Sequence, residues 1–182
     1  MRPMVRVKVA TVMAVGVLSL GASLWMIAAL QGGPSAALGL DLAAWETRRA
    51  TAALEPPPDI ATAKTATEAV IAQAPADTSA WLRLAYIDSL DGDLSADGVL
   101  ALERSYKLIA FDQYTVVWRT RFALDHWQAL PPELQAMVRS EALGFLRTKK
   151  GRALRETWGQ SPNPQGRMVA QFWLAEHRRR RS

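Results

Sequence analysis

Hydrophobic and polar positions divide this 182-residue chain into one long uncharged run and a series of shorter amphipathic segments. The run extends from Val9 to Leu30 and holds 22 residues without a charge. As a helix rising about 1.5 Å per residue, such a run spans the roughly 30 Å hydrocarbon core of a bilayer. The pattern therefore predicts a transmembrane anchor. Its membrane-contacting residues include Val9, Leu18, Leu20, Leu24, Trp25 and Leu30.

After this run, apolar residues recur at spacings of three and four, which is typical of amphipathic helices. Capping aspartates, glycines and prolines mark where these helices begin and end. The expected helices cover 41–54, 59–74, 78–90, the segment after the turn at 91–95, 114–130, 132–149, 152–158 and a last segment containing Met168, Phe172 and Trp173. No segment has the alternation of a strand, so the fold class is all-α.

The same pattern divides the chain into five parts. Residues 1–8 are a basic N-terminus, 9–30 the transmembrane helix, 31–58 a juxtamembrane helix with a proline-rich linker, 59–178 a helical domain, and 179–182 a basic tail. Pro56, Pro57 and Pro58 favour a stiff, extended spacer because proline lacks a backbone N–H. We expect this spacer to hold the helical domain off the bilayer.

One stretch carries a recognisable spacing. Trp81 is followed by Leu84, the small residue Ala85 and a glycine, Gly92, before the next helix; Ser105 supplies a late small residue if one residue is inserted in the turn. This stretch of roughly 45 residues resembles a tetratricopeptide repeat. The resemblance implies a stack of about three helical hairpins that binds protein segments on its surface. A generic helical hairpin is the alternative, because Asp88 stands where the family usually has tyrosine.

Seven tryptophans argue for packed tertiary structure, since disordered segments are depleted in large aromatics. Four of them share helical stripes with aliphatic residues and are expected in the core: Trp81, Trp118, Trp127 and Trp173. Trp25 and Trp45 lie near the outer end of the predicted anchor and on the juxtamembrane helix. There an indole ring can rest at the headgroup level.

Charge is distributed unevenly along the chain. From Leu38 to Met137 there are eight Lys and Arg against fourteen Asp and Glu, whereas from Val138 to Ser182 there are eleven against three. The basic residues of the last third are Arg147, Lys149, Lys150, Arg152, Arg155, Arg178, Arg179, Arg180 and Arg181 among others. They are candidate contacts for anionic lipid or polysaccharide; the alternative is a solvated tail. We expect no nucleic-acid partner.

Charge also predicts topology. Arg2, Arg6 and Lys8 precede the apolar run, and the far side reaches a charge only at Asp41. The positive-inside rule then leaves the N-terminus in the cytoplasm and places the helical domain in the periplasm, at the inner membrane. The preference for arginine over lysine and the abundant alanine suggest a high-GC bacterial source. A cleaved signal peptide and a cytoplasmic domain are the alternative interpretations.

No constellation in the chain indicates catalysis, so we assign no catalytic, cofactor-binding or metal-ligating residues. The absence of cysteine excludes disulfides and thiolate chemistry. The acidic turn from Asp88 to Asp97 lacks the glycine and the terminal glutamate of a calcium loop, and capping explains it better. His126 and His177 have acidic neighbours in sequence, but adjacent helical residues point about 100° apart, so both are expected at the surface.

These observations favour a membrane-anchored periplasmic scaffold or adaptor that mediates protein-protein interactions in cell-envelope assembly, for example in polysaccharide export or the assembly of a membrane complex. One alternative is a lipid- or polyanion-binding module that uses the basic last third. A second is a secreted helical binding protein released by signal cleavage. The residues do not identify the partner.

Overall fold

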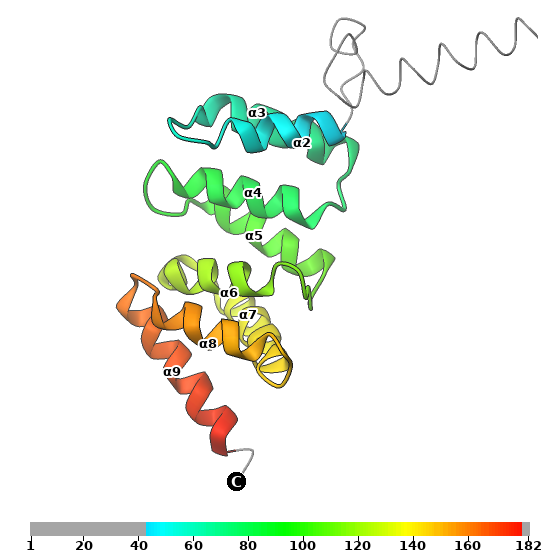
Figure 1. Ribbon diagram of the computed structural model, residues 1–182. Coiled ribbons are helices and arrows are strands. Elements are labelled where there is room, and N and C mark those ends of the chain that lie inside the picture. Colours follow the sequence, from blue (N-terminus) through cyan, green and yellow to red (C-terminus); the bar gives the residue numbers. More distant parts are fainter. Residues whose placement is uncertain (1–42, 180–182) are drawn as a thin grey trace, which may run out of the picture. The chain divides into compact units, whose positions relative to one another are not determined.

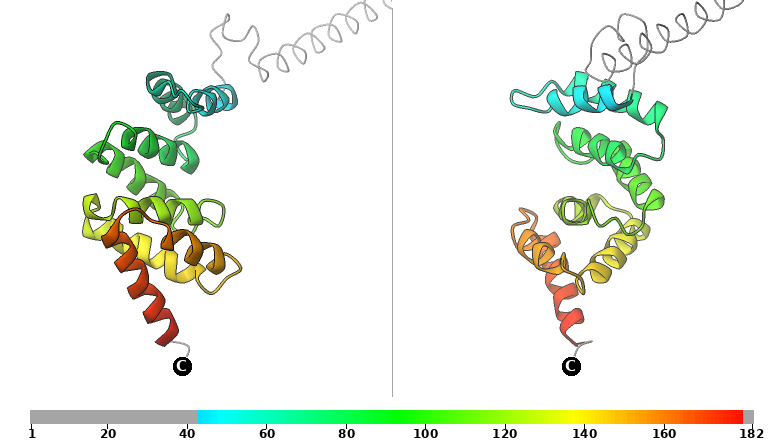
Figure 2. Two further views of the ribbon diagram at one scale, coloured as in Figure 1. Left: turned by 60° about the vertical axis from the view of Figure 1, so that its left-hand side comes forward. Right: turned by 45° about the vertical axis from the view of Figure 1, so that its right-hand side comes forward.

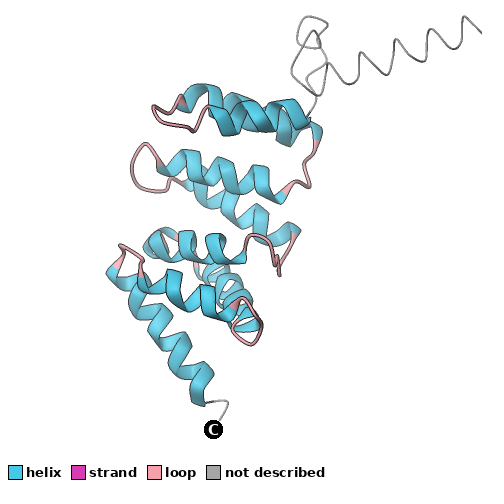
Figure 3. Ribbon diagram, viewed as in Figure 1, coloured by secondary structure: helices cyan, strands magenta, loops and turns pink. Residues whose placement is uncertain are grey.

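A computed structural model describes residues 43–179 of the protein, apart from the side chain of Trp45. Within this range every regular element is a helix and no strand occurs (Figure 3), which confirms the all-α prediction. None of these helices is long and apolar enough to cross a membrane. The predicted anchor at 9–30, its Trp25, and Asp41, Arg180 and Arg181 lie outside the described residues.

The chain forms two compact units, the first of which ends at Ala74. It contains α2 (Ala43–Ala52) and α3 (Ile60–Gln73), which pack side by side as a hairpin (Figure 1). Asp59 caps α3, because its Oδ1 accepts a hydrogen bond from the Thr62 amide at 3.0 Å. Helix α2, which the sequence analysis assigned to a juxtamembrane segment, therefore packs against α3.

The three consecutive prolines lie in the turn between these two helices and do not form the extended spacer that the sequence suggested. Proline ends α2 because it cannot donate a helical hydrogen bond. The chain then folds back, and the Asp59 amide donates to the Ala53 carbonyl at 2.7 Å.

The second compact unit begins at Pro75 and contains the remaining helices (Figure 2). They are α4 (Thr78–Ser89), α5 (Ala96–Leu108), α6 (Val116–Asp125), the 3-10 turn η2 (Trp127–Ala129), α7 (Pro132–Phe145), α8 (Gly151–Gly159) and α9 (Pro164–Arg179). Helices α4 and α5 form a hairpin, and α6 contacts α7, α8 and α9. This succession of packed helices is compatible with a helical repeat fold.

The core of the second unit draws on all of its α-helices. Its fully buried large side chains include Leu102, Leu124, Leu134, Leu154 and Trp158. Trp158 lies with its ring perpendicular to that of Trp173, at a centroid distance of 5.6 Å. Its Nε1 also donates to Thr120 Oγ1 at 3.2 Å, so the indole is both packed and hydrogen-bonded.

Two helix ends differ by several residues from those that the sequence predicted. The helix expected over 114–130 ends at Asp125, and Trp127–Ala129 form the separate 3-10 turn. Here Asn163 Nδ2 donates to the Asp125 carbonyl at 3.0 Å, so a distant loop occupies an acceptor at the helix end. The next helix begins at Pro132 as predicted but ends at Phe145, and Gly151 opens α8. A Cβ at Gly151 would lie 2.4 Å from the Leu146 carbonyl oxygen, so this glycine permits a close turn.

Candidate functional site

A buried ion pair lies at the meeting point of α5, α6 and α7. Arg119 on α6 and Glu141 on α7 are both fully buried. The Arg119 Nε donates to Glu141 Oε2 at 3.2 Å, and Nη2 donates to Oε1. The guanidinium carbon also stands 3.9 Å from the ring centroid of Tyr106 on α5. A cation on an aromatic face and a two-pronged carboxylate contact together compensate for desolvation of the charge.

Burial governs the titration of this cluster. Desolvation raises the pKa of Glu141, while the hydrogen bonds and charge of Arg119 oppose that rise. Burial also raises the pKa of Tyr106 well above its usual range, and the negative charge of Glu141 adds to this effect. No member of the cluster reaches solvent, so its role is structural and it is not a site for substrate.

The ion pair fixes the connection between α5 and α6. Arg119 donates to the backbone carbonyls of Ser105 and Ile109, at 3.2 and 3.0 Å. Glu141 Oε1 accepts from the Asp112 amide at 3.0 Å. Asp112 in turn accepts from the Tyr114 amide at 2.9 Å and from the Thr115 hydroxyl at 2.8 Å. The backbone of the 109–115 connection is thus held from both ends.

That connection forms one wall of an open pocket of about 270 Å³ between α4 and α6. The pocket is lined by Ser79, Leu82, Arg83, Tyr86, Tyr114, Thr115 and Trp118. Three of these are aromatic and exposed, Tyr114 by 86 %, Trp118 by 43 % and Tyr86 by 38 %. Exposed aromatic side chains around a concavity are typical of binding surfaces, because they provide large contact area at low cost in conformational entropy.

The aromatic wall is continuous along α6. Trp118 meets Tyr86 edge to face at 6.1 Å and stacks on Phe122 at 4.9 Å, and Phe122 contacts His126 at 4.7 Å. Trp118 therefore lines the pocket and does not belong to the core, contrary to the sequence-based expectation. Trp173 is buried as expected, and Trp81 and Trp127 pack partly buried against the core.

Arg83 supplies the cationic group of the pocket. Its Nη1 is buried and has no hydrogen-bond partner in the structure. Desolvation lowers the pKa of Arg83, and the charge of Asp77 partly opposes this. Arginine stays protonated in proteins even so. An unpaired guanidinium nitrogen beside apolar walls is suited to a carboxylate or another anionic acceptor on a bound molecule.

The residues of the repeat-like pattern lie on other faces of the same hairpin and have packing roles. Ala85 and Ser105 are fully buried, and Leu84 is partly buried against the core. The Trp81 Nε1 donates to the Pro75 carbonyl at 2.9 Å. Gly92 adopts a φ of 142°, a conformation that favours glycine. The sequence pattern thus located the hairpin that carries the pocket, but not the pocket residues.

In the acidic turn after α4, Asp88 holds the turn and Ser95 caps α5 by accepting from the Gly98 amide. Asp88 accepts from the Ser95 amide at 2.8 Å and from the Ser95 hydroxyl at 2.7 Å. No group of acidic or histidine side chains suited to a metal ion occurs in residues 43–179. Of the two histidines expected at the surface, His177 is buried and His126 is partly buried. Burial lowers the pKa of His126, with Asp125 opposing.

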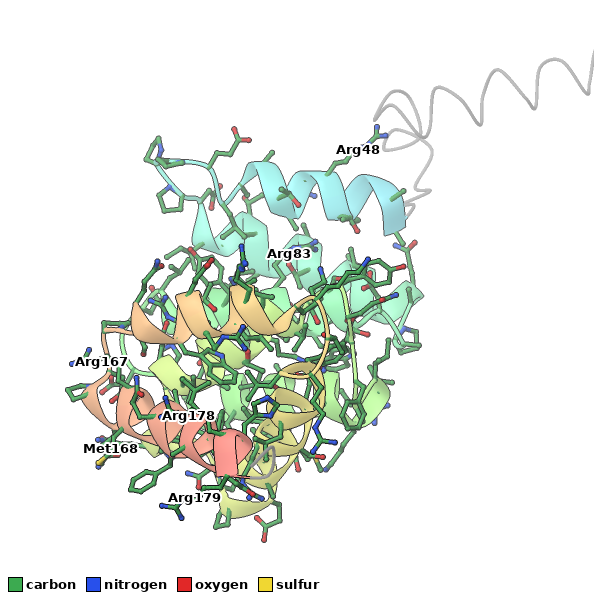
Figure 4. All side chains as sticks on the ribbon, turned by 60° about the horizontal axis from the view of Figure 1, so that its bottom comes forward. Arg48, Arg83, Arg167, Met168, Arg178 and Arg179 are labelled. Atoms are coloured by element: carbon green, nitrogen blue, oxygen red, sulfur yellow. The ribbon has the colours of Figure 1, made fainter. Side chains whose placement is uncertain are left out.

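The basic residues of the last third fall into two groups. Arg147, Lys149 and Lys150 are exposed at the turn between α7 and α8, and Arg152 and Arg155 are exposed on α8. The second group, Arg178 and Arg179, is exposed at the end of α9 (Figure 4). Helices α8 and α9 diverge from their connecting loop (Figure 1).

Comparison with protein-family models, with curated proteins and with solved structures finds no match to this chain. The functional argument therefore rests on the residues themselves. Two features missed by the sequence interpretation carry it: the pocket between α4 and α6, and the buried pair that positions one of its walls.

Proposed function

We propose that the protein is a membrane-anchored helical adaptor, with its helical domain in the periplasm, that binds a segment of a partner protein in the pocket between α4 and α6. The observation that carries this proposal is the open pocket with three exposed aromatic walls and an unpaired buried arginine nitrogen. The uncharged run at 9–30 supports the anchor, and the basic residues before it support the orientation. The resemblance to tetratricopeptide repeats supports peptide binding.

The chemistry of the pocket defines the partner segment. Leu82 forms a buried apolar part of the lining, and Tyr86, Tyr114 and Trp118 offer ring faces and edges. Arg83 adds a positive charge to the lining, and its Nη1 has no hydrogen-bond partner. The matching segment therefore pairs an aromatic or branched apolar side chain with a nearby carboxylate.

Peptide display against the full-length chain in lipid nanodiscs tests this assignment. Enriched peptides should combine an aromatic or branched residue with Asp, Glu or a free C-terminus. The Arg83→Gln variant should lose the acidic preference and keep the apolar one, while Arg104→Gln on α5 should change neither. Enrichment of basic peptides, or the same acidic preference in Arg83→Gln, would contradict the proposal.

Site-specific crosslinking then tests the pocket in cells. A photoreactive residue at Tyr114 should capture a partner in membranes, and one at Leu100, which is 60 % exposed on α5, should not. Trp118→Ala should reduce the Tyr114 adduct. An adduct that persists in both Trp118→Ala and Arg83→Gln would place the partner elsewhere on the protein.

The anchor and its orientation need a separate measurement. Protease added to spheroplasts should digest the helical domain and leave a short membrane-bound fragment. Protection of the domain would support a cytoplasmic location. Full recovery in the soluble fraction, with an N-terminus near Ala37, would indicate the secreted alternative.

A further inference from the structure

Helix α9 buries one face and exposes an apolar stripe on another. Gly166, Ala170, Trp173 and His177 recur at helical spacing and are buried. Met168 and Phe172 lie one turn apart on a different face and are exposed by 54 % and 69 %. Because side chains at i and i+4 adjoin on a helix, these two form a continuous apolar surface. The described residues of the chain leave it uncovered.

Arginines lie beside and beyond this apolar stripe. Arg167 lies beside Met168, and Arg178 and Arg179 follow at the end of the helix (Figure 4). In sequence two further arginines come next, Arg180 and Arg181. The single carboxylate of α9 is Glu176, and Arg139 on α7 engages it at 2.7 Å. The exposed side of α9 therefore carries an apolar pair with arginines to one side and at the helix end, and its one carboxylate is paired with Arg139.

This combination favours an anionic bilayer over a second copy of the chain. In a two-fold contact the same patch would meet itself, which would bring arginine clusters of equal sign together. At a bilayer surface, apolar side chains enter the headgroup boundary while arginines contact anionic lipid. The 22-residue uncharged run of the same chain independently indicates that the protein resides at a membrane.

We propose that α9 docks on the surface of an anionic phospholipid bilayer through Met168 and Phe172, with Arg167, Arg178 and Arg179 contacting the lipid headgroups. This contact is separate from the pocket between α4 and α6 and does not depend on what that pocket binds. It gives the second unit its own attachment to the membrane, in addition to the predicted anchor.

The absence of cysteine allows a direct test with the full-length chain. The Phe172→Cys variant carries an environment-sensitive fluorophore and is reconstituted into nanodiscs of phosphatidylcholine alone or mixed with phosphatidylglycerol. The emission should shift to the blue in anionic discs only, and this shift should decrease at high salt because the arginine contacts are screened. Leu100→Cys, on exposed α5, is the matched control and should show no lipid-dependent shift.

A charge variant separates lipid contact from mere exposure. In the labelled protein, Arg178→Gln with Arg179→Gln should reduce the ratio of docked to undocked protein at least about tenfold, because each arginine near an anionic surface contributes to binding. Arg152→Gln with Arg155→Gln on α8 removes exposed charge elsewhere and should have little effect. Arg167 is kept, because its Nη1 holds the loop before α9 through the Ser161 carbonyl at 2.6 Å.

Three outcomes would overturn the proposal. One is emission at position 172 that is equal in neutral and anionic discs and typical of water. Another is a blue shift that is equal in all lipids and in detergent, which would show that part of the protein covers the stripe. The third is a blue shift that increases with the number of protein copies per disc and not with anionic lipid, which would show self-association. Failure of peptide binding at the α4–α6 pocket would leave the fluorescence emission at position 172 unchanged, so the two proposals are tested separately.

Discussion

Arg119 and Glu141 form a fully buried ion pair that also holds the backbone between α5 and α6, so one interaction joins three helices and positions a wall of the pocket. Such a pair is not necessarily a large net source of stability, because both charges lose their hydration. Its consequence is geometric. The Ile109 carbonyl and the Asp112 amide have this pair as their partners, and the pocket residue Tyr114 comes two residues after Asp112.

Removing one member of the pair should be strongly destabilising. Glu141→Ala leaves the Arg119 charge buried without its carboxylate and should lower the free energy of unfolding by about 3–5 kcal/mol. Urea unfolding of the full chain in detergent micelles, followed by tryptophan fluorescence, measures this. The double variant Arg119→Met with Glu141→Leu should be more stable than Glu141→Ala, although it still leaves the Ile109 carbonyl and Asp112 amide unpaired. A double variant less stable than Glu141→Ala would contradict this account.

Two tryptophans of this unit should differ sharply when truncated. Trp158 is fully buried and hydrogen-bonded to Thr120, so Trp158→Ala should cost about 3–5 kcal/mol through the lost packing and the cavity. Trp118 is 43 % exposed and makes one stacked and one edge contact, so Trp118→Ala should cost about 1 kcal/mol. The same urea titration compares them. Equal losses would show that Trp118 belongs to the core after all.

The spacing of apolar residues was sufficient to predict the all-α class and most helix starts, because caps such as Asp59 and Asp77 act within one turn of the helix. Helix ends were predicted less well. At Asp125 the helix end is contacted by Asn163, which lies 38 residues away in the sequence. Local patterns contain no information about such a partner.

The candidate site was predictable only in part, for the same reason. The sequence analysis gave Arg119 and Glu141 no role, because nothing local indicates that residues 22 positions apart are paired in the core. Trp118 shares its helical stripe with aliphatic residues, which made it look like a core residue. Whether an amphipathic face is covered depends on neighbouring helices, and this also left the exposure of Met168 and Phe172 unforeseen.

Two glycines should respond in opposite ways to replacement by alanine. A Cβ at Gly166 would lie 2.1 Å from the Leu124 carbonyl oxygen, so Gly166→Ala must push α9 away from α6 and should cost about 1–3 kcal/mol. At Gly159 a Cβ meets nothing within 4 Å, so Gly159→Ala should be neutral or stabilise by about 0.4–1 kcal/mol through the unfolded chain. Thermal unfolding of the two variants distinguishes them. Destabilisation of similar size in both would indicate that the close approach of α9 to α6 does not restrict the side chain at position 166.

His126 should make stability depend on pH. Burial against Phe122 lowers the pKa of His126 below its usual 6.5, so the unfolded chain binds a proton more readily than the folded one. By linkage, this contribution to stability is fully present above pH 6.5 and is lost progressively as the pH falls from 6.5 to the lowered pKa. His126→Gln cannot titrate and should lack this decrease. His177 is present in both proteins, so the difference between their unfolding free energies from pH 7.5 to pH 5 reports on His126 alone. A difference that stays constant across this range, or that grows in favour of the wild type at low pH, would show that the ring is not desolvated.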